Sequence, residues 1–145
     1  MDARLTARGL LTLYCVLQGI GPLAIDLNRT HAANPLWTGH ARFHVVWQSL
    51  SQLLICICAC VLIWWPQPAD LQRFYSVVSL MTASLFSFLF AFFCRKLYGG
   101  SLSDPNGIRP ARIHLNGKIL LIDLNMVTVL AGLVVLVVIV AIFNK

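Results

Sequence analysis

Charged residues are scarce in this chain, and glutamate is absent from it. Only 11% of the 145 residues are charged, whereas 59% are apolar and the mean hydropathy is +0.80. A soluble domain carries roughly 25% charged residues, so the composition excludes that class. No stretch outside the apolar segments is long enough to bury a core of its own. We therefore expect one domain, residues 1–145, embedded in a membrane.

Four apolar stretches, residues 8–25, 43–64, 74–94 and 124–143, predict the fold. Each has about the 20 residues that a helix needs to cross ~30 Å of hydrocarbon. The predicted fold class is therefore an all-α integral membrane protein, a bundle of four transmembrane helices. Gly21 and Pro22 are expected to loosen the end of the first helix, and Thr38 is a plausible N-cap for the second.

An Asn116-Gly117 pair between two apolar-rich runs predicts a small β-hairpin in the loop before helix four. We expect this hairpin to lie on the bundle, with Asp123 as the N-cap of the last helix. The alternative is a fourth helix that starts earlier.

Four crossings place both termini on one side and residues 26–42 and 95–123 on the other. The loop side carries seven Lys and Arg residues against four on the terminus side, so the loops are expected to face the cytoplasm. The basic start resembles a signal sequence, but Asp26 and Arg29 stand where small cleavage residues belong, so we expect the segment to be retained. A multi-pass protein of the endoplasmic reticulum or of a bacterial inner membrane fits this pattern.

The net charge of +6 comes from scattered basic residues that suit anionic lipid headgroups and not nucleic acid. The five cysteines all fall in predicted helices, where Cys58 would point away from Cys56 and Cys60, so we interpret them as packing residues. The expected partners are the lipid bilayer and a lipophilic small molecule. Association into a homo-oligomer stays open.

The histidines gather in the two loops and at the helix ends beside them: His31, His40, His44 and His114. His40 and His44 stand four residues apart and form one helical stripe with Trp47. Polar groups at membrane depth usually face the bundle interior and mark a ligand or proton path. We therefore predict a pocket at the loop face.

Imidazoles near a carboxylate can act as general acid and base, which suits isomerisation, cyclisation or epoxide opening of a lipophilic molecule. On this hypothesis the proton-transferring and charge-holding catalytic residues are Asp26, His31, His40, His44 and Asp123. The predicted substrate-binding residues are Arg42, Trp47, Gln48, Tyr98, His114 and Asn125.

Two other interpretations stay open: a non-enzymatic lipophilic-ligand binder or accessory protein, and a His-based metal or redox site. A metal ion could use His40 and His44 with a third histidine or Asp26, and a haem would need His44 and His114. No full ligand set is evident, so we expect no cofactor and no resident metal. Histidines that converge on an unoccupied apolar pocket would favour the enzyme, whereas dispersed histidines that face lipid or headgroups would favour a structural or accessory role.

Several short motifs resemble a group of small four-helix membrane proteins from bacteria and fungi. The motifs are Asp26-Leu27-Asn28-Arg29-Thr30-His31, Asn34-Pro35-Leu36-Trp37, His40-Ala41-Arg42-Phe43-His44, Tyr98-Gly99-Gly100, Asp104-Pro105 and Asp123-Leu124-Asn125. The group resembles, more loosely, DoxX-type proteins and the sterol-isomerase and sigma-2-receptor superfamily, whose bundles accept hydrophobic molecules. The resemblance implies the four-helix fold and a pocket within it. The catalytic glutamates of the sterol isomerases have no counterpart here, so an enzyme would have to use Asp and His. Small membrane-bound epoxide hydrolases and cyclases of fungal polyketide and terpenoid pathways are a further analogy in size and topology.

Overall fold

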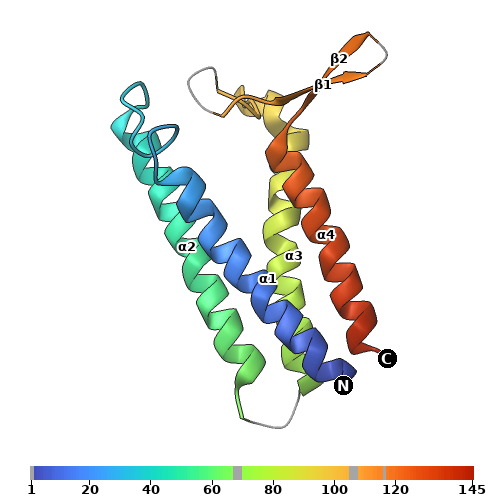
Figure 1. Ribbon diagram of the computed structural model, residues 1–145. Coiled ribbons are helices and arrows are strands. Elements are labelled where there is room, and N and C mark those ends of the chain that lie inside the picture. The colour runs from blue at the N-terminus through green and yellow to red at the C-terminus, as the bar shows by residue number, and fades with distance from the viewer. Residues whose placement is uncertain (1, 67–69, 105–107, 116) are drawn as a thin grey trace.

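The computed structural model describes residues 2–66, 70–104, 108–115 and 117–145 (Figure 1). Its helices are α1 (Ala3–Asp26), α2 (Gly39–Trp64), α3 (Asp70–Cys94) and α4 (Leu124–Phe143), with a short 3-10 helix, η1 (Arg95–Tyr98), after α3. Strands β1 (Ala111–Leu115) and β2 (Lys118–Ile122) form an antiparallel hairpin before α4. All four α-helices are long and apolar enough to cross a membrane. The four apolar spans and the hairpin predicted from the sequence are thus confirmed.

Local sequence explains where the helices begin. The Thr38 hydroxyl accepts a hydrogen bond from the Ala41 N–H (3.2 Å) and caps α2. The Asp123 carboxylate accepts one from the Met126 N–H (2.9 Å) and caps α4. Both caps satisfy backbone donors that a helix leaves unpaired, as predicted.

The first helix differs from the prediction near its end. It does not loosen at Gly21 and Pro22 but continues through both residues to Asp26. A proline removes one backbone donor yet keeps a helical φ, and neighbouring elements can satisfy the carbonyl that it frees. Asp26 therefore lies on a regular helical turn.

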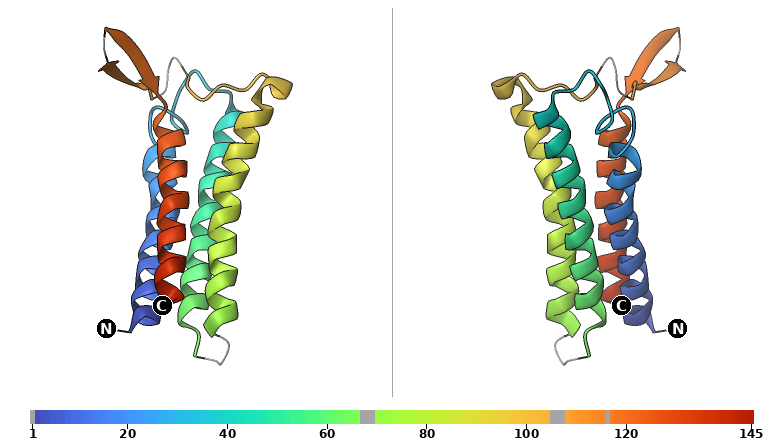
Figure 2. Two further views of the ribbon diagram at one scale, coloured as in Figure 1. Left: turned by 90° about the vertical axis from the view of Figure 1, so that its right-hand side faces the viewer. Right: turned by 90° about the vertical axis from the view of Figure 1, so that its left-hand side faces the viewer.

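The hairpin has the predicted turn but not the predicted position. Leu115 pairs with Lys118, and Gly117 adopts φ +75°, as a two-residue turn requires, while Asn116 lies outside the described residues. The prediction that the hairpin lies on the bundle is wrong: most of its residues are exposed, and Figures 1 and 2 show it extending away from the helices. Asp123 is the one residue between β2 and α4, so the link is too short for the hairpin to fold back onto the helices.

The helices pack as a four-membered ring with α1 diagonal to α3. Helix α1 contacts α2 and α4, and α3 contacts the same two helices, as the two views of Figure 2 also show. The α1–α2 contact is the most extensive, and it is closest at Gly19, where a Cβ atom would come within 2.9 Å of the Cys56 Cβ. Small residues allow such close approach of apolar helices.

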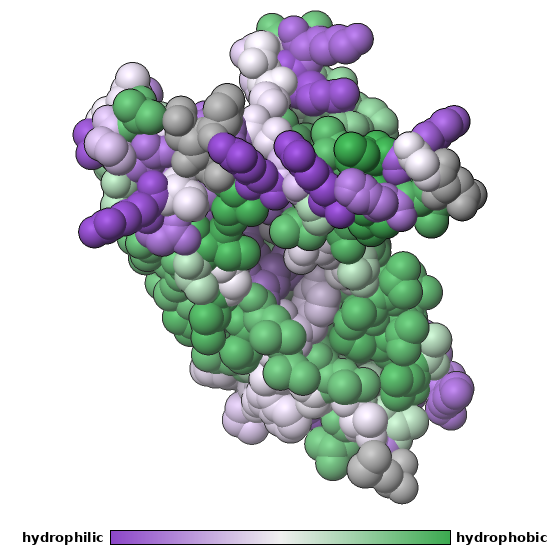
Figure 3. Space-filling view, turned by 45° about the horizontal axis from the view of Figure 1, so that its top comes forward, coloured by the Kyte–Doolittle hydropathy of each residue, from purple (hydrophilic) through white to green (hydrophobic). Residues whose placement is uncertain are grey.

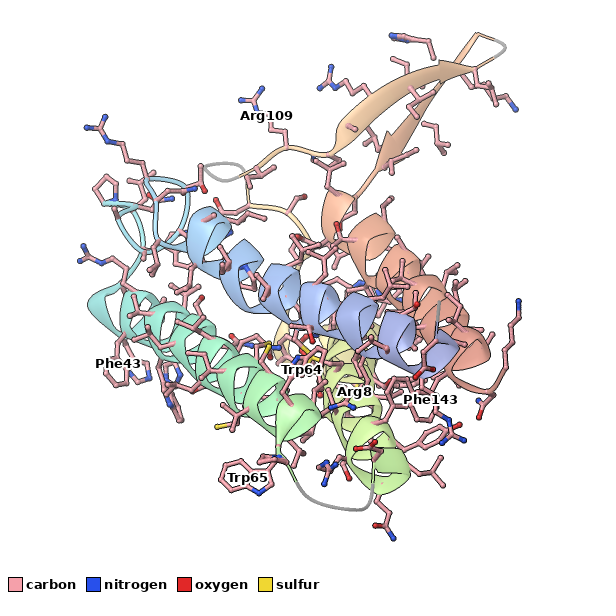
Figure 4. The ribbon with its side chains drawn as sticks, turned by 60° about the horizontal axis from the view of Figure 1, so that its bottom comes forward. Arg8, Phe43, Trp64, Trp65, Arg109 and Phe143 are labelled. Carbon is pink, nitrogen blue, oxygen red and sulfur yellow. The ribbon has the colours of Figure 1, made fainter. Side chains whose placement is uncertain are left out.

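The end of the bundle that holds the termini is firmly closed. The Arg8 guanidinium donates to the Ile63 carbonyl (2.7 Å), lies 4.7 Å from the Trp64 ring and pairs with Asp70 at 3.6 Å (Figure 4). One side chain thus ties α1 to the end of α2 and the start of α3. Arg8 therefore packs against other helices in addition to contributing positive charge to the terminus side.

The opposite end, which holds the loops, is open. Leu11, Cys15 and Met81 are fully buried, and Ser49 nearer the loops is 2% exposed, but several other residues on the loop side are only half-buried. These loop-side positions are Pro22, Val45, Phe88, Phe92 and Met126. The α1–α2 and α3–α4 pairs diverge towards the loops in Figure 1, and Figure 3 shows a hollow there with hydrophilic residues inside and around it. We call this part of the bundle the open half.

Candidate functional site

Four polar side chains lie about midway along the helices: Gln18, Gln52, Cys56 and Ser84. We call them the polar layer. The Gln52 Oε1 accepts a hydrogen bond from the Ser84 hydroxyl (3.1 Å), and the Gln52 amide nitrogen lies 3.5 Å from the Cys56 sulfur. The Ser84–Gln52 bond joins α3 to α2, whereas the Gln52–Cys56 contact lies within α2; polar side chains commonly join apolar membrane helices in the first way. The polar layer forms the floor of the open half.

Gln18 contributes the unsatisfied group of this layer. Its amide nitrogen donates weakly to the Met81 carbonyl of α3 (3.4 Å), whereas its Oε1 atom is shielded from solvent and has no hydrogen-bond partner among the described residues. A buried acceptor left unpaired costs about 1–3 kcal/mol. The Gln18 oxygen is therefore available to a donor that reaches the polar layer.

Asp26 and Ser49 form a second polar contact, nearer the loops. The Ser49 hydroxyl lies 3.0 Å from Asp26 Oδ2 and 2.8 Å from the Val45 carbonyl, and its single hydrogen can serve one of these acceptors at a time. Ser49 is only 2% exposed. The carboxylate at the end of α1 is thus tied to the inner face of α2.

The histidine stripe of α2 lies on the outer surface and does not face the interior. His40 and His44 are exposed, as are Gln48 and Trp47, and Phe43 beside them points away from the other helices in Figure 4. The inner face of α2 instead carries a different helical stripe: Ser49, Gln52, Cys56, Ala59 and Ile63. His40 and His44 hydrogen-bond to each other, with 3.0 Å between their Nε2 atoms.

The other predicted catalytic residues are separate from this pair. His31 lies in the α1–α2 loop, where its Nδ1 is 2.8 Å from the Thr30 hydroxyl and its ring meets Trp37 edge-on. Asp123 caps α4. No described contact joins Asp26 to either histidine of α2. The described part of the structure does not gather the predicted catalytic residues into one constellation.

The predicted substrate-binding residues are also dispersed. Arg42 and Asn125 are exposed near the starts of α2 and α4, and His114 is exposed on β1. The Tyr98 hydroxyl donates to the Ala91 carbonyl (2.8 Å) and packs beside the end of α3. His40, His44 and His114 are thus exposed, and the predicted binding residues do not converge on one pocket.

Among the described residues, Tyr98 lines one of two pockets on the helix surfaces, and the other predicted site residues line neither of these two. The larger, of about 310 Å³, lies between α1 and α2. Its wall is apolar apart from three thiols, and it opens on the outer surface because several of its residues are themselves exposed: Val16, Ile20, Ile57 and Val61. The smaller, of about 160 Å³, lies at the end of α3 beside Arg95 and Tyr98.

The residues described contain no group of three or more His, Cys or Asp side chains that could hold a metal ion. Cys56 is buried and Cys58 is exposed, so the cysteines of α2 point to different sides, as the helical spacing predicted. A redox or metal centre with a full protein ligand set therefore has no support from the described residues.

Sequence reasoning missed Gln18, Ser49 and Ser84, which are the side chains that the structure turns inward. The signal for Gln18 was present, because an amide within a long apolar helix is expensive unless it faces a partner or a ligand. The prediction relied on the histidines instead, because imidazoles can act as acids, bases and metal ligands. Their direction could not be read from the spacing of α2 alone.

Comparison of the chain with protein-family models, with curated proteins and with solved structures finds no match. Four α-helices apolar enough to span a membrane form a bundle that is closed at one end and open at the other, with the polar layer between the two ends.

Proposed function

We propose that the protein is a multi-pass integral membrane protein that binds a lipophilic small molecule in its open half. The helices present apolar side chains over most of their outer surface, as lipid contact requires. The endoplasmic reticulum or a bacterial inner membrane, with the loops towards the cytoplasm, is the proposed location.

The unpaired Gln18 oxygen carries this proposal. It lies at the floor of the open half, in a layer where the other polar groups have partners. Intramembrane polar side chains that face a bundle interior commonly mark a ligand path. A molecule with an apolar body and an O–H or N–H donor would fill the open half and satisfy the Gln18 acceptor. Long-chain alcohols and sterol-like alcohols have this chemistry.

Photolabelling in lipid nanodiscs tests the proposal. The probe is a long-chain fatty alcohol that carries a diazirine on its chain, and the matching probe without the hydroxyl group measures non-specific contact. We expect the alcohol to label inward-facing residues of α3 such as Phe88. Gln18→Leu should reduce this labelling at least about fivefold, equivalent to loss of one hydrogen bond of roughly 1 kcal/mol.

Gln48→Leu is the matched control, because it replaces an exposed glutamine on the outer face of α2. It should leave labelling unchanged. Gln18→Leu removes an unpaired polar atom, so it should not unfold the protein. Equal labelling of Gln18→Leu and the unaltered protein, or labelling confined to outer faces, would overturn the proposal.

Acid/base turnover of the bound molecule is the second candidate function, and the Asp26–Ser49 contact favours it. This contact places a carboxylate beside the inner face of α2 at the loop end. In this version Asp26 transfers a proton to or from an isomerisable, cyclisable or epoxide substrate.

The nanodiscs can be incubated with epoxides, polyenes and sterol-like compounds, and the mass of each compound can be measured before and after incubation. Asp26→Asn should abolish any turnover while it leaves alcohol labelling intact; turnover that survives this change excludes Asp26 as the acid or base.

A further inference from the structure

The two exposed histidines of α2 form a preorganised pair. They stand one turn apart, and their ring centroids are 4.4 Å apart with planes nearly perpendicular (87°). The two Nε2 atoms lie 3.0 Å apart. At least one of the two nitrogens must be unprotonated, since one ring donates and the other accepts.

This separation suits two nitrogen ligands of one metal ion. Imidazole nitrogen binds such ions at about 2.0–2.1 Å. If an ion lies at that distance from two nitrogens that are 3.0 Å apart, the nitrogen–metal–nitrogen angle is about 90°. A right angle is the cis angle of square-planar and tetragonal sites, which Cu²⁺ and Ni²⁺ prefer, and Cu²⁺ binds nitrogen more tightly than the other divalent ions of its row.

We propose that His40 and His44 chelate one Cu²⁺ ion at the loop end of the bundle through their Nε2 atoms. No third protein ligand lies within the described set, so the remaining coordination positions are open to water or to an added ligand. The ion is therefore exchangeable and not a resident cofactor, which is consistent with the absence of a full ligand set in the sequence. This site lies on the outer surface of α2 and is independent of lipophilic-ligand binding in the open half.

The surroundings of the pair provide a second readout. The Trp47 ring centroid lies 5.7 Å from that of His44, and the Phe43 ring lies 6.0 Å from it. A paramagnetic ion held at the histidines would quench the fluorescence of Trp47. The other tryptophans lie elsewhere: Trp37 in the α1–α2 loop, and Trp64 and Trp65 at the opposite end of α2.

Titration of the chelator-stripped, detergent-solubilised protein with Cu²⁺ tests the proposal. We expect one Cu²⁺ per chain, an electron paramagnetic resonance spectrum with hyperfine coupling to two nitrogens, and tryptophan quenching that Trp47→Phe largely removes. His40→Ala and His44→Ala should each abolish the two-nitrogen signal. Both positions are exposed and helical, and alanine is the better helix former, so these variants should fold.

His114→Ala is the matched control, because it removes an exposed histidine of the hairpin at the same end. It should leave the Cu²⁺ spectrum unchanged. Ni²⁺, which does not oxidise thiols, should bind at the same stoichiometry and be lost in the same variants. A wild-type protein that binds no more Cu²⁺ or Ni²⁺ than the His40→Ala/His44→Ala double variant overturns the proposal. So does a spectrum that survives His44→Ala, since the ion would then be held elsewhere.

Discussion

At the scale of single residues, Gly19 sets how closely α1 and α2 approach. A Cβ atom at this position would lie 2.9 Å from the Cys56 Cβ, 3.4 Å from its sulfur and 3.5 Å from a Leu53 methyl. Rigid side chains of a neighbouring helix form this contact, so it can be relieved only if the helices separate. Gly21, two residues on in the same helix, has nothing within 4 Å of such an atom.

Gly19→Ala and Gly21→Ala should therefore change stability in opposite directions. Overpacking at position 19 should destabilise the protein by about 1–3 kcal/mol. At position 21 the better helix propensity of alanine should stabilise it by up to roughly 1 kcal/mol. Thermal unfolding of both variants in one detergent measures the difference. Equal unfolding temperatures would show that the α1–α2 contact at Gly19 has room for an added methyl group.

At the scale of helices and strands, the best sequence predictions were those with local causes. The caps Thr38 and Asp123 were predicted correctly because a capping side chain bonds backbone groups only two or three residues away. The hairpin followed from its turn residues in the same way. The position of the hairpin was predicted wrongly because it depends on the one-residue link at Asp123, a tertiary consequence that no turn pattern contains.

The direction in which each helix faces could not be predicted, and α2 shows why. Its outer surface is as apolar as its inner surface, with Leu54 61% and Val61 52% exposed. Lipid is as apolar as a packed helix, so hydrophobicity does not mark the inner face of a membrane helix. Polar side chains were the available guide, but the His40–His44 stripe, which was predicted to face inward, faces outward, and the Ser49–Gln52 stripe faces inward.

Substitution of Asp123 separates its capping role from a catalytic one. Asp123→Ala should destabilise the start of α4 by about 1 kcal/mol, because the Met126 N–H loses its acceptor. Asp123→Asn should cost little, since asparagine caps helices as well as aspartate does. Hydrogen exchange at the first turn of α4 reports the local change. If a reaction is found and Asp123→Asn stops it without faster exchange, the carboxylate has a chemical role beyond the cap.

At the scale of the whole molecule, the contrast between the two ends organises the bundle. Arg8 and the stacked rings of Phe74 and Phe143, 3.7 Å apart, join the helices at the terminus end. At the loop end, the Asp26–Ser49 bond joins α1 to α2 only. This bond therefore does not link the α1–α2 pair to the α3–α4 pair.

Cysteine labelling of a variant without native cysteines tests the expected topology. Leu36 and Arg109 lie at the loop end, and Leu71 lies at the terminus end; all three are exposed. A membrane-impermeant maleimide should label Leu36→Cys and Arg109→Cys from one side of sealed vesicles. Leu71→Cys should react only from the other side. Labelling of Leu36→Cys and Arg109→Cys from opposite sides would refute the four-crossing topology.

In a bilayer, the proposed ligand contact at the polar layer would make the two leaflets unequal for this protein. Gln18 lies eight residues before the end of α1, a rise of about 12 Å, which is less than half of the ~30 Å hydrocarbon thickness. A ligand that ends at Gln18 would thus stay within the leaflet next to the loops. The terminus end is joined across the bundle by Arg8 and by the Phe74–Phe143 stack. Binding and release of the ligand would then depend on the composition of one monolayer. In vesicles whose opposite monolayer alone contains the probe, the probe would reach the protein only as fast as it crosses from one monolayer to the other.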